Sequence, residues 1–360
     1  MESYRCIEVK SFLDKRKFLK FPSTLYTEDD CPQNYNTEKL LLNKKHPLSN
    51  DIEIFPYIVL NEHDKVVCRS MMTYYKDDNT AYVGFFESHK NIPAVRKMFE
   101  IIEEKAIKDG KTKILGPIDV SIYINYRFKV DRFDKTYTSE PYNKDYYAWL
   151  WEHIGFNVCD NYISNQLRKV EEGDIDARLE RIYHRYKDRG YKFISPTDET
   201  YNQCLNDVYD LMMNLYADFS GFKKLTREQF IHLYTQMKAV MNFNMVKLVY
   251  NTESKPCAFC ICLPNYDNLL RGKLSFSKIA RIQELKENPT EYVVLYLGAR
   301  PESVGLGGAL IHLIRNELYK NGCTSIGALI KEGNVTGQMY EDLYVDKFNY
   351  VLLEKEFGVI

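Results

Sequence analysis

Three glycines near the C-terminus form the pattern with the clearest chemical potential. Gly305, Gly307 and Gly308 lie in the stretch YLGARPESVGLGGALIHLI, between a run rich in β-formers and an amphipathic run. Glycine has no side chain to cover the backbone N–H groups, and the first turn of a helix carries partial positive charge. A loop of this kind can hold a diphosphate without a lysine or a metal ion. The spacing therefore predicts a phosphate-binding loop at the start of a helix.

Two common phosphate-binding motifs do not fit this stretch. A Walker loop continues as Gly-Lys-Ser/Thr, whereas Gly308 is followed by Ala309 and Leu310. A dinucleotide fingerprint has its first glycine directly after the strand and would need its third at position 310, which is a leucine. For the glycines alone, a tight turn with close helix packing is the alternative. The secondary structure predicted on either side of the glycines distinguishes a packing turn from a ligand site.

The elements around the glycines predict a β–α–β unit. EYVVLYLGA at residues 291–299 is rich in β-formers, and TSIGALI at residues 324–330 is typical of a second strand. Between these runs, apolar residues recur at intervals of three and four from Leu306 onward, and Asn321-Gly322 ends the predicted helix. Asn334 follows the second strand, and Tyr340 lies on the next predicted helix.

This order of strand, glycine loop, helix, strand, Asn and Tyr resembles motif A and the region after it in the Gcn5-related N-acetyltransferase (GNAT) superfamily. The resemblance implies a mixed α/β fold with acetyl-CoA as co-substrate. It implies that strand N–H groups contact the acyl carbonyl, that the glycine loop holds the diphosphate, and that an Asn contacts the pantetheine arm. The implied cofactor-binding residues are Leu297, Gly298, Ala299, Ser303, Val304, Gly305, Leu306, Gly307, Gly308, Ala309 and Asn334. Glu302 departs from the family pattern, which has Gln or Arg there.

Acyl transfer from a thioester to an amine needs a donor for the leaving thiolate and an acceptor for the amine proton. The resemblance implies Tyr340 as the donor, because a tyrosine pKa of about 10 lies close to that of a thiol. Tyr344 is the alternative donor, since the spacing is one residue shorter than usual. Glu291 opens the strand of the carbonyl site and is the candidate base. Other candidates are Glu228, His232 and Tyr296, and proton loss through water is also open.

The N-terminal half repeats the same order of elements without the glycines. Residues 53–87 predict antiparallel strands, residues 93–109 predict a helix, and KTKILGPI predicts the next strand. Asn143, Tyr147 and Gly155-Phe156 fit the superfamily's final helix, so this half resembles GNAT domains as well. Because GFFESHKNIPAVRKM contains no Gly-x-Gly, we expect this half to bind no cofactor. The sequence thus predicts two GNAT-like domains in tandem, at residues 1–170 and 190–360, joined by a helical linker at 171–189.

Composition and charge narrow the possible partners and the expected location of the protein. The formal net charge is −1, which gives no sign of a general nucleic-acid binder. No stretch approaches the ~18 apolar residues of a membrane helix, and the N-terminus has no signal-peptide pattern, so we expect a cytoplasmic protein without a membrane partner. Of the nine cysteines, only Cys257 and Cys260 have a paired spacing. They lie in a predicted buried strand, so we expect no metal site.

The sequence therefore predicts an N-acyltransferase, most simply an N-acetyltransferase, that uses acyl-CoA and an amine of a small molecule or peptide. One alternative is a Fem-type aminoacyl transferase, also a tandem of GNAT-like halves, which would use charged tRNA. The near-neutral charge and the apparent CoA loop weigh against it. Another alternative is a non-catalytic module that keeps CoA as a structural or sensing ligand.

Overall fold

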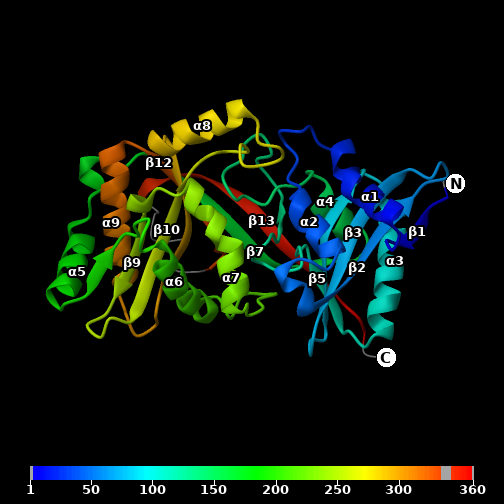
Figure 1. Ribbon diagram of the computed structural model, residues 1–360, viewed down its shortest axis with the longest axis horizontal. Helices are drawn as coiled ribbons and strands as arrows, with labels where there is room; N and C mark the ends of the chain where they lie inside the picture. The colour runs from blue at the N-terminus through cyan, green and yellow to red at the C-terminus, as the bar shows by residue number, and fades with distance from the viewer. Residues whose placement is uncertain (1–2, 334–341, 359–360) are drawn as a thin grey trace. The chain divides into compact units, whose positions relative to one another are not determined.

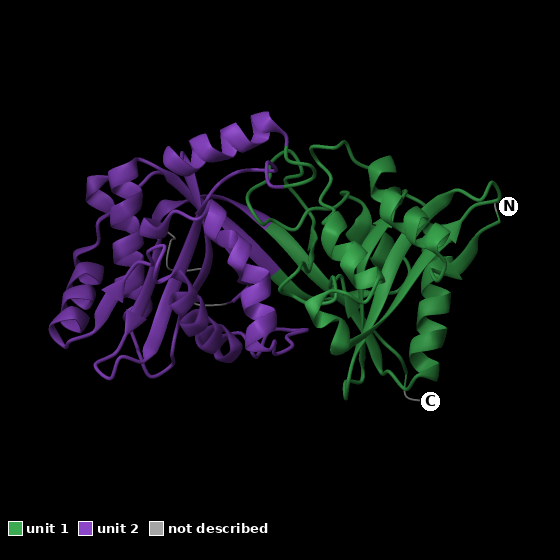
Figure 2. Ribbon diagram, in the orientation of Figure 1, with its two compact units in different colours: residues 1–161, 271–274, 349–360 green, residues 162–270, 275–348 purple. Residues whose placement is uncertain are grey.

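The computed structural model describes residues 3–333 and 342–358 (Figure 1). It divides into two compact units, shown in Figure 2. Unit 1 comprises residues 1–161, 271–274 and 349–360, and unit 2 comprises residues 162–270 and 275–348. The boundaries cross strands β7 (Asn157–Leu167) and β13 (Tyr344–Glu356), and each strand gives residues to both units. The last segment of the chain therefore belongs to the unit that the N-terminal half builds.

Unit 1 is built on a mixed sheet. Four strands pair antiparallel in sequence order: β1 (Arg5–Glu8), β2 (Ile52–Leu60), β3 (Val66–Tyr75) and β4 (Thr80–Ser88). β5 (Lys113–Gly116) runs parallel to β4, and residues 353–356 of β13 pair antiparallel with β5. The short β6 (Phe128–Lys129) also pairs with β13. Asp64 and Asp77 adopt left-handed backbone angles in the turns before β3 and β4, which aspartate tolerates better than most residues.

The helices of unit 1 include the one that connects its parallel strands. They are α1 (Phe12–Lys20), α2 (Tyr35–Leu42), α3 (Ile92–Lys108) and α4 (Tyr147–Glu152). Helix α3 joins β4 to β5 and packs on β1, β2, β3 and β5. Its buried residues recur three and four apart, as the sequence periodicity predicts: Ala94, Val95, Met98, Phe99, Ile102 and Ala106. Gly110, at φ 76°, follows its last turn, so the predicted helix is confirmed.

Unit 2 has the corresponding mixed sheet. Its antiparallel strands are β8 (Lys192–Ile194), β9 (Val246–Tyr250), β10 (Pro256–Pro264) and β11 (Glu291–Ala299). β12 (Thr324–Lys331) runs parallel to β11 and pairs on its other side with residues 162–167 of β7. The helices are α5 (Ala177–Asp188), α6 (Tyr201–Leu215), α7 (Arg227–Tyr234), α8 (Phe276–Glu287) and α9 (Leu306–Asn321). Helix α5, in the segment expected as a linker, lies in unit 2 and packs along α9.

Each unit has its own hydrophobic core. In unit 1, the core lies between α3, α4 and the strands, with Trp151 and Phe99 fully buried at its centre. In unit 2, the core lies between α9 and strands β10 and β11, and it includes Cys257, Cys260 and Cys262. The expected buried strand at these cysteines is confirmed. The combination of parallel and antiparallel strands with connecting helices confirms the predicted α/β class with a mixed sheet.

Candidate cofactor-binding site

Strands β11 and β12 pair over only half of the length of β11. Their parallel register runs from Glu291↔Thr324 to Val294↔Gly327, whereas β10 continues to pair with β11 as far as Ala299. Beyond Gly327, β12 shifts its register against β7, and Leu329 adopts a left-handed φ of 59°. Within the described chain, the edge of β11 toward β12 therefore has no ladder partner from 295 to 299. Alternate peptide groups on this edge can bond a ligand.

A bulge changes which face each residue of β11 occupies. The pairing with β10 jumps from Cys262↔Val294 to Ile261↔Tyr296, so Leu295 is the extra residue. Val294 is buried in the core against α9, and after the bulge Leu297 and Ala299 pack on that same core. Without the extra residue, strict alternation would place Tyr296 and Gly298 there instead. The bulge therefore turns Tyr296 and Gly298 toward the opposite face, where a Cβ on Gly298 would lie 2.7 Å from Leu215.

The glycine loop follows β11 directly and ends in an uncapped helix. Gly305 occupies the N-cap position of α9 at φ 90°, a region that favours glycine, and it provides no side-chain cap. The N–H of Leu306 donates to the carbonyl of Ser303, and the N–H of Ala309 donates to the carbonyl of Gly305. Among the described residues, no acceptor faces the N–H groups of Gly307 and Gly308. These two N–H groups are therefore open donors at the start of a helix, a kind of group that can bond an anion.

Helix α5 holds the loop from one side. The hydroxyl of Tyr186 donates to the carbonyl of Val304 at 2.7 Å. Gly308 allows close packing here, since a Cβ at this position would lie 3.1 Å from a methyl group of Leu179 and would require that side chain to shift slightly. Glu302, the residue that departs from the family pattern, is largely exposed and lies 3.9 Å from Arg300. The loop thus combines a backbone held by α5 with two opposite charges, which give it little net attraction for an anion.

Glu291 lies at the wrong end of its strand for a base. It is the first residue of β11, and six residues of extended strand place it about 20 Å from Leu297. Both of its carboxylate oxygens accept hydrogen bonds, from Asn265 at 2.7 Å and from Thr324 at 2.9 Å. These contacts fix the start of β11 against β12. The geometry therefore opposes the interpretation of Glu291 as the residue that deprotonates the acceptor.

The other predicted catalytic residues are distributed as follows. Asn334 and Tyr340 lie outside the described residues, so their roles stay predictions. Tyr344, the alternative acid, is the first residue of β13 and is half exposed. Glu228 and His232 are exposed on α7, in its first and last turns. Tyr296 is half-buried on β11 beyond the bulge.

Aromatic side chains gather on the face of β11 that carries Tyr296 and Gly298. The hydroxyl groups of Tyr296 and Tyr234 lie 3.0 Å apart, and the ring of Tyr216 packs edge-on to Tyr296 at 6.1 Å. Phe219 packs on Tyr216 and stacks with Tyr162. We call these five residues the aromatic cluster. Sequence reasoning singled out only Tyr296, because the others come from α7, from the segment after α6 and from β7, and only the fold brings them together.

Comparison with known proteins relates this architecture to a known fold. No protein-family model and no curated protein sequence matches the chain. A tandem GNAT protein from the clavulanic acid biosynthesis pathway matches 99% of this chain and 100% of its own, with a TM-score of 0.52 and 12% identity. A probable N-acyltransferase of unknown function from Enterococcus faecalis V583 matches 98% of this chain and 73% of its own, with a TM-score of 0.53 and 9% identity. The chain has a tandem GNAT fold.

A region of a fungal protein is also similar in structure to nearly the whole chain. The GCN5-related glucosamine N-acetyltransferase region of a multi-domain β-N-acetylglucosaminidase matches 99% of this chain and 38% of that protein, with a TM-score of 0.53 and 9% identity. The tandem GNAT fold confirms the resemblance inferred from the glycine loop. Among residues 3–333 and 342–358, no three His, Cys, Asp or Glu side chains are placed to hold a metal ion. No helix in the same residues is long and apolar enough to span a membrane.

Proposed function

We propose that the protein is an N-acyltransferase that transfers an acyl group, acetyl in the simplest case, from acyl-CoA to an amine of a small molecule or peptide. One observation carries the proposal: a single β–α–β unit combines an unpaired strand edge with an uncapped, glycine-rich helix start. Peptide N–H groups on a strand edge can bond the carbonyl oxygen of a thioester. Peptide N–H groups at the start of a helix can bond a diphosphate. The tandem GNAT fold supports the same interpretation.

The residues around this unit fit the parts of acyl-CoA. The N–H groups of Gly307 and Gly308 would bond diphosphate oxygens, and the remaining loop from Ser303 to Ala309 would fix their direction. The peptide edge at Leu297–Ala299 would bond the acyl carbonyl oxygen. Asn334, outside the described residues, is proposed to contact the pantetheine arm. When bound, acyl-CoA supplies the activated thioester, and the protein supplies position and hydrogen bonds.

The chemistry then depends on three actions of the chain. Fixed N–H groups of β11 stabilise negative charge that develops on the carbonyl oxygen as the amine attacks. Tyr340 is proposed to give its phenolic proton to the leaving sulfur, and to regain a proton from water. Glu291 does not take the proton of the attacking amine in this scheme, because it lies about 20 Å from the carbonyl edge and is engaged by Asn265 and Thr324. The proton goes to water or to one of the other candidates, Glu228, His232 and Tyr296. No metal ion is required by this scheme.

The aromatic cluster is the proposed binding surface for the amine. Four of its rings are half-buried and Tyr162 is fully buried. Tyr296 lies on the segment of β11 that also carries the proposed carbonyl site. Aromatic faces attract ammonium groups and also bury apolar surface of a ligand. The paired hydroxyl groups of Tyr234 and Tyr296 add two polar atoms that can orient the acceptor. We therefore expect an acceptor with an amine next to an apolar group.

Calorimetric titration of the full-length protein with acetyl-CoA tests the cofactor site. The wild-type protein should bind one acetyl-CoA per chain, and Gly307→Val should weaken binding at least ~100-fold, because a branched side chain covers the peptide groups that face the ligand. Gly173→Val is the matched control, since nothing lies within 4 Å of a Cβ on Gly173. Circular dichroism confirms that both variants fold. Wild-type affinity in a folded Gly307→Val protein would mean that the loop is only a packing turn.

Thiol release over a panel of amines tests the reaction. We expect turnover with amines that carry an apolar group, and Tyr340→Phe should lower kcat at least ~10-fold while acetyl-CoA affinity stays nearly unchanged. Acetyl-CoA binding without thiol release for any amine would favour the non-catalytic module. Absence of acetyl-CoA binding by the wild-type protein would overturn the proposal as a whole.

A further inference from the structure

Helix α5 lies antiparallel to α9 and places its C-terminal turns at the start of α9. The segment before α5 reaches the later turns of α9, where Arg315 donates to the carbonyl of Asp174. In the middle of α5, Leu179 lies against Gly308. Near its end, Tyr186 bonds the carbonyl of Val304 in the glycine loop. The stretch of α5 from Leu179 to Tyr186 therefore flanks the glycine loop.

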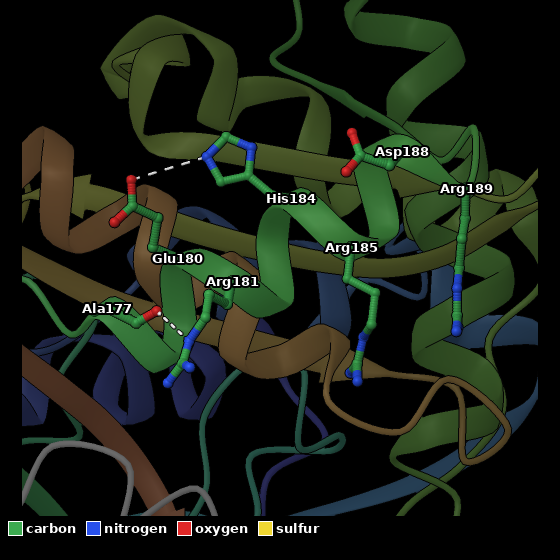
Figure 3. Close-up of a pocket in the computed structure, with 7 residues that line it drawn as sticks. All are labelled: Ala177, Glu180, Arg181, His184, Arg185, Asp188 and Arg189. Atoms are coloured by element: carbon green, nitrogen blue, oxygen red, sulfur yellow. Dashed lines mark hydrogen bonds and ion pairs between the residues drawn. The ribbon is translucent and has the colours of Figure 1, made fainter.

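One side of α5 carries a row of arginines. Arg181, Arg185 and Arg189 are spaced four residues apart, and Figure 3 shows their side chains extending in the same direction, away from His184 and Asp188. A shallow surface hollow runs along this helix and is lined by Ala177, Glu180, Arg181, His184, Arg185, Asp188 and Arg189. Glu180 is directed at His184, with which it forms an ion pair at 3.8 Å. The hollow thus carries more cations than anions.

One of these arginines lies beside the glycine loop, and a second lies one helical turn further along the same side of α5. A guanidinium nitrogen of Arg185 lies 3.6 Å from the position that a Cβ on Gly305 would take. Arg189 follows one helical turn later and extends in the same direction as Arg185 (Figure 3). Burial raises the pKa of Tyr186, and the charges of Arg185 and Arg189 act in the opposite direction. In the part of the chain that the structure describes, neither arginine forms an ion pair with a carboxylate. Both are available to an anion at the loop.

The loop itself needs such a cation. At the position where the superfamily has Gln or Arg, the chain has Glu302, and Arg300 lies 3.9 Å from that carboxylate. The loop's own charges therefore largely cancel. Coenzyme A carries a 3′-phosphate in addition to its diphosphate, and guanidinium groups bind phosphate by bidentate, charge-assisted hydrogen bonds. In the proposed function the peptide N–H groups of α9 bind the diphosphate. The arginines of α5 are then the groups that can bind the 3′-phosphate.

We propose that Arg185 and Arg189 bind the 3′-phosphate of coenzyme A, so that α5 supplies the positive charge that the glycine loop lacks. This inference rests on the proposed function. It makes α5 part of the cofactor site and makes the 3′-phosphate a requirement for tight binding. Dephospho-CoA, which retains the diphosphate and the pantetheine arm, should therefore bind the protein more weakly than coenzyme A does.

Calorimetric titration with coenzyme A and with dephospho-CoA tests the inference on the full-length protein. The wild type should prefer coenzyme A at least ~10-fold, in line with one charge-assisted phosphate contact. In the Arg185→Ala/Arg189→Ala variant this preference should fall to less than ~2-fold, while affinity for dephospho-CoA stays at the wild-type value. Arg178→Ala is the matched control, because Arg178 lies about 10 Å from Arg185 along the same helix and faces Asp176.

The outcomes separate the inference from the proposed function. Retention of the full preference for coenzyme A by the double variant would overturn the role of the two arginines and leave the acyltransferase proposal standing. An equal loss of affinity for both ligands would overturn the assignment to the 3′-phosphate, because it would locate the contact at the diphosphate. Binding of neither ligand by the wild-type protein would overturn the proposed function together with the inference.

Discussion

The two units contain the same β–α–β motif. They differ at the part of its first strand that extends beyond the parallel pairing. In unit 1, the parallel strands β4 and β5 are joined by α3, and in unit 2, the parallel strands β11 and β12 are joined by α9. The parallel pairing stops early in both, after Tyr82 and after Val294. A bulge follows in β4 and in β11. The units differ in what bonds the peptide groups beyond that point.

In unit 1, the chain's own side chains bond the strand edge. The carboxylate of Asp119 accepts the N–H of Phe85, and the hydroxyl of Tyr147 accepts the N–H of Ser88 at 3.0 Å. Tyr147 is the residue that fits the superfamily's final helix, and here it is fully buried. Its hydroxyl donates in turn to Glu87 at 2.6 Å. The edge that could bond a thioester in unit 2 is therefore satisfied internally in unit 1.

The first turns of α3 and α9 also differ in whether the chain's own side chains bond the backbone N–H groups. Asn91 caps α3 by accepting the N–H of Ala94 at 3.0 Å, and Pro93 removes a further donor from the first turn. In α9 the cap is Gly305, which has no side chain to accept these bonds. Two units with the same fold can thus differ in the number of backbone N–H groups that are open to a ligand, because a few capping side chains differ. If the proposed site is right, the capacity to bind a diphosphate depends on which backbone groups the chain leaves without a hydrogen-bond partner.

Hydrogen exchange with and without acetyl-CoA tests this difference most directly. With ligand at 100 times its Kd, peptides covering residues 304–313 should be protected by up to ~100-fold, because a ligand bound to the folded state adds about 2.7 kcal/mol to the opening free energy. Peptides covering residues 84–98 should exchange at unchanged rates. Mass spectrometry of short labelling times measures both. Equal protection of the two segments would contradict the assignment of one cofactor site per chain.

The internal bonds of unit 1 predict an unusual pH dependence. Glu87 is 6% exposed, and burial raises its pKa to about 7, an effect that the charge of Arg69 and the hydrogen bond from Tyr147 only partly offset. Between the ordinary pKa near 4.5 and pH 7, the folded state keeps a proton that the unfolded state has released. Stability from Glu87 is therefore present at low pH and is lost as the pH rises, by on the order of 3 kcal/mol.

Glu87→Gln isolates this contribution. The amide is neutral at every pH and its oxygen can still accept the hydrogen bond of Tyr147, so the variant should gain stability over the wild type as the pH rises from 5 to 8. Urea unfolding at several pH values measures the gain. Glu104→Gln, an exposed position on α3, serves as the control and should follow the wild-type curve. A constant difference between Glu87→Gln and the wild type at all pH values would show that the buried carboxyl is not neutral.

The local elements of both units could be predicted from the sequence, because their signals are local. The three-and-four spacing of apolar residues identified α3 and α9, and the glycines marked the start of α9. The bulge at Leu295 could not be predicted, since it depends on how two neighbouring strands pair. Nor could the pairing of β5 with residues 353–356, which lie more than 200 positions away in the chain. Long-range partners are chosen by packing, and the local pattern does not contain them.

The sequence of helix α5 contains an apolar stripe that indicates packing on a neighbour, but its many charged residues dominated the interpretation. Its many charged residues and its position between the two halves favoured the interpretation of residues 171–189 as a helical linker. However, Leu179, Ile182, Tyr183 and Tyr186 recur at intervals of three, one and three, which is the apolar stripe of a helix that packs on a neighbour. The same stripe places Arg185 beside Gly305. The proposed site in unit 2 therefore includes a segment that composition alone describes as a connector.

Tyr186→Phe provides the finest test of the comparison, because it removes only the bond by which α5 holds the loop. Loss of the 2.7 Å hydrogen bond to the carbonyl of Val304 should lower the free energy of unfolding by about 1 kcal/mol. Acetyl-CoA affinity should fall by ~3-fold to ~10-fold, since a less ordered loop must be fixed again on binding. Tyr191→Phe, which alters the aromatic neighbour of Tyr186, is the control and should change neither quantity by a comparable amount. If Tyr186→Phe lost stability at unchanged acetyl-CoA affinity, the loop would be ordered without α5, and the uncapped start of α9 would suffice to distinguish unit 2 from unit 1.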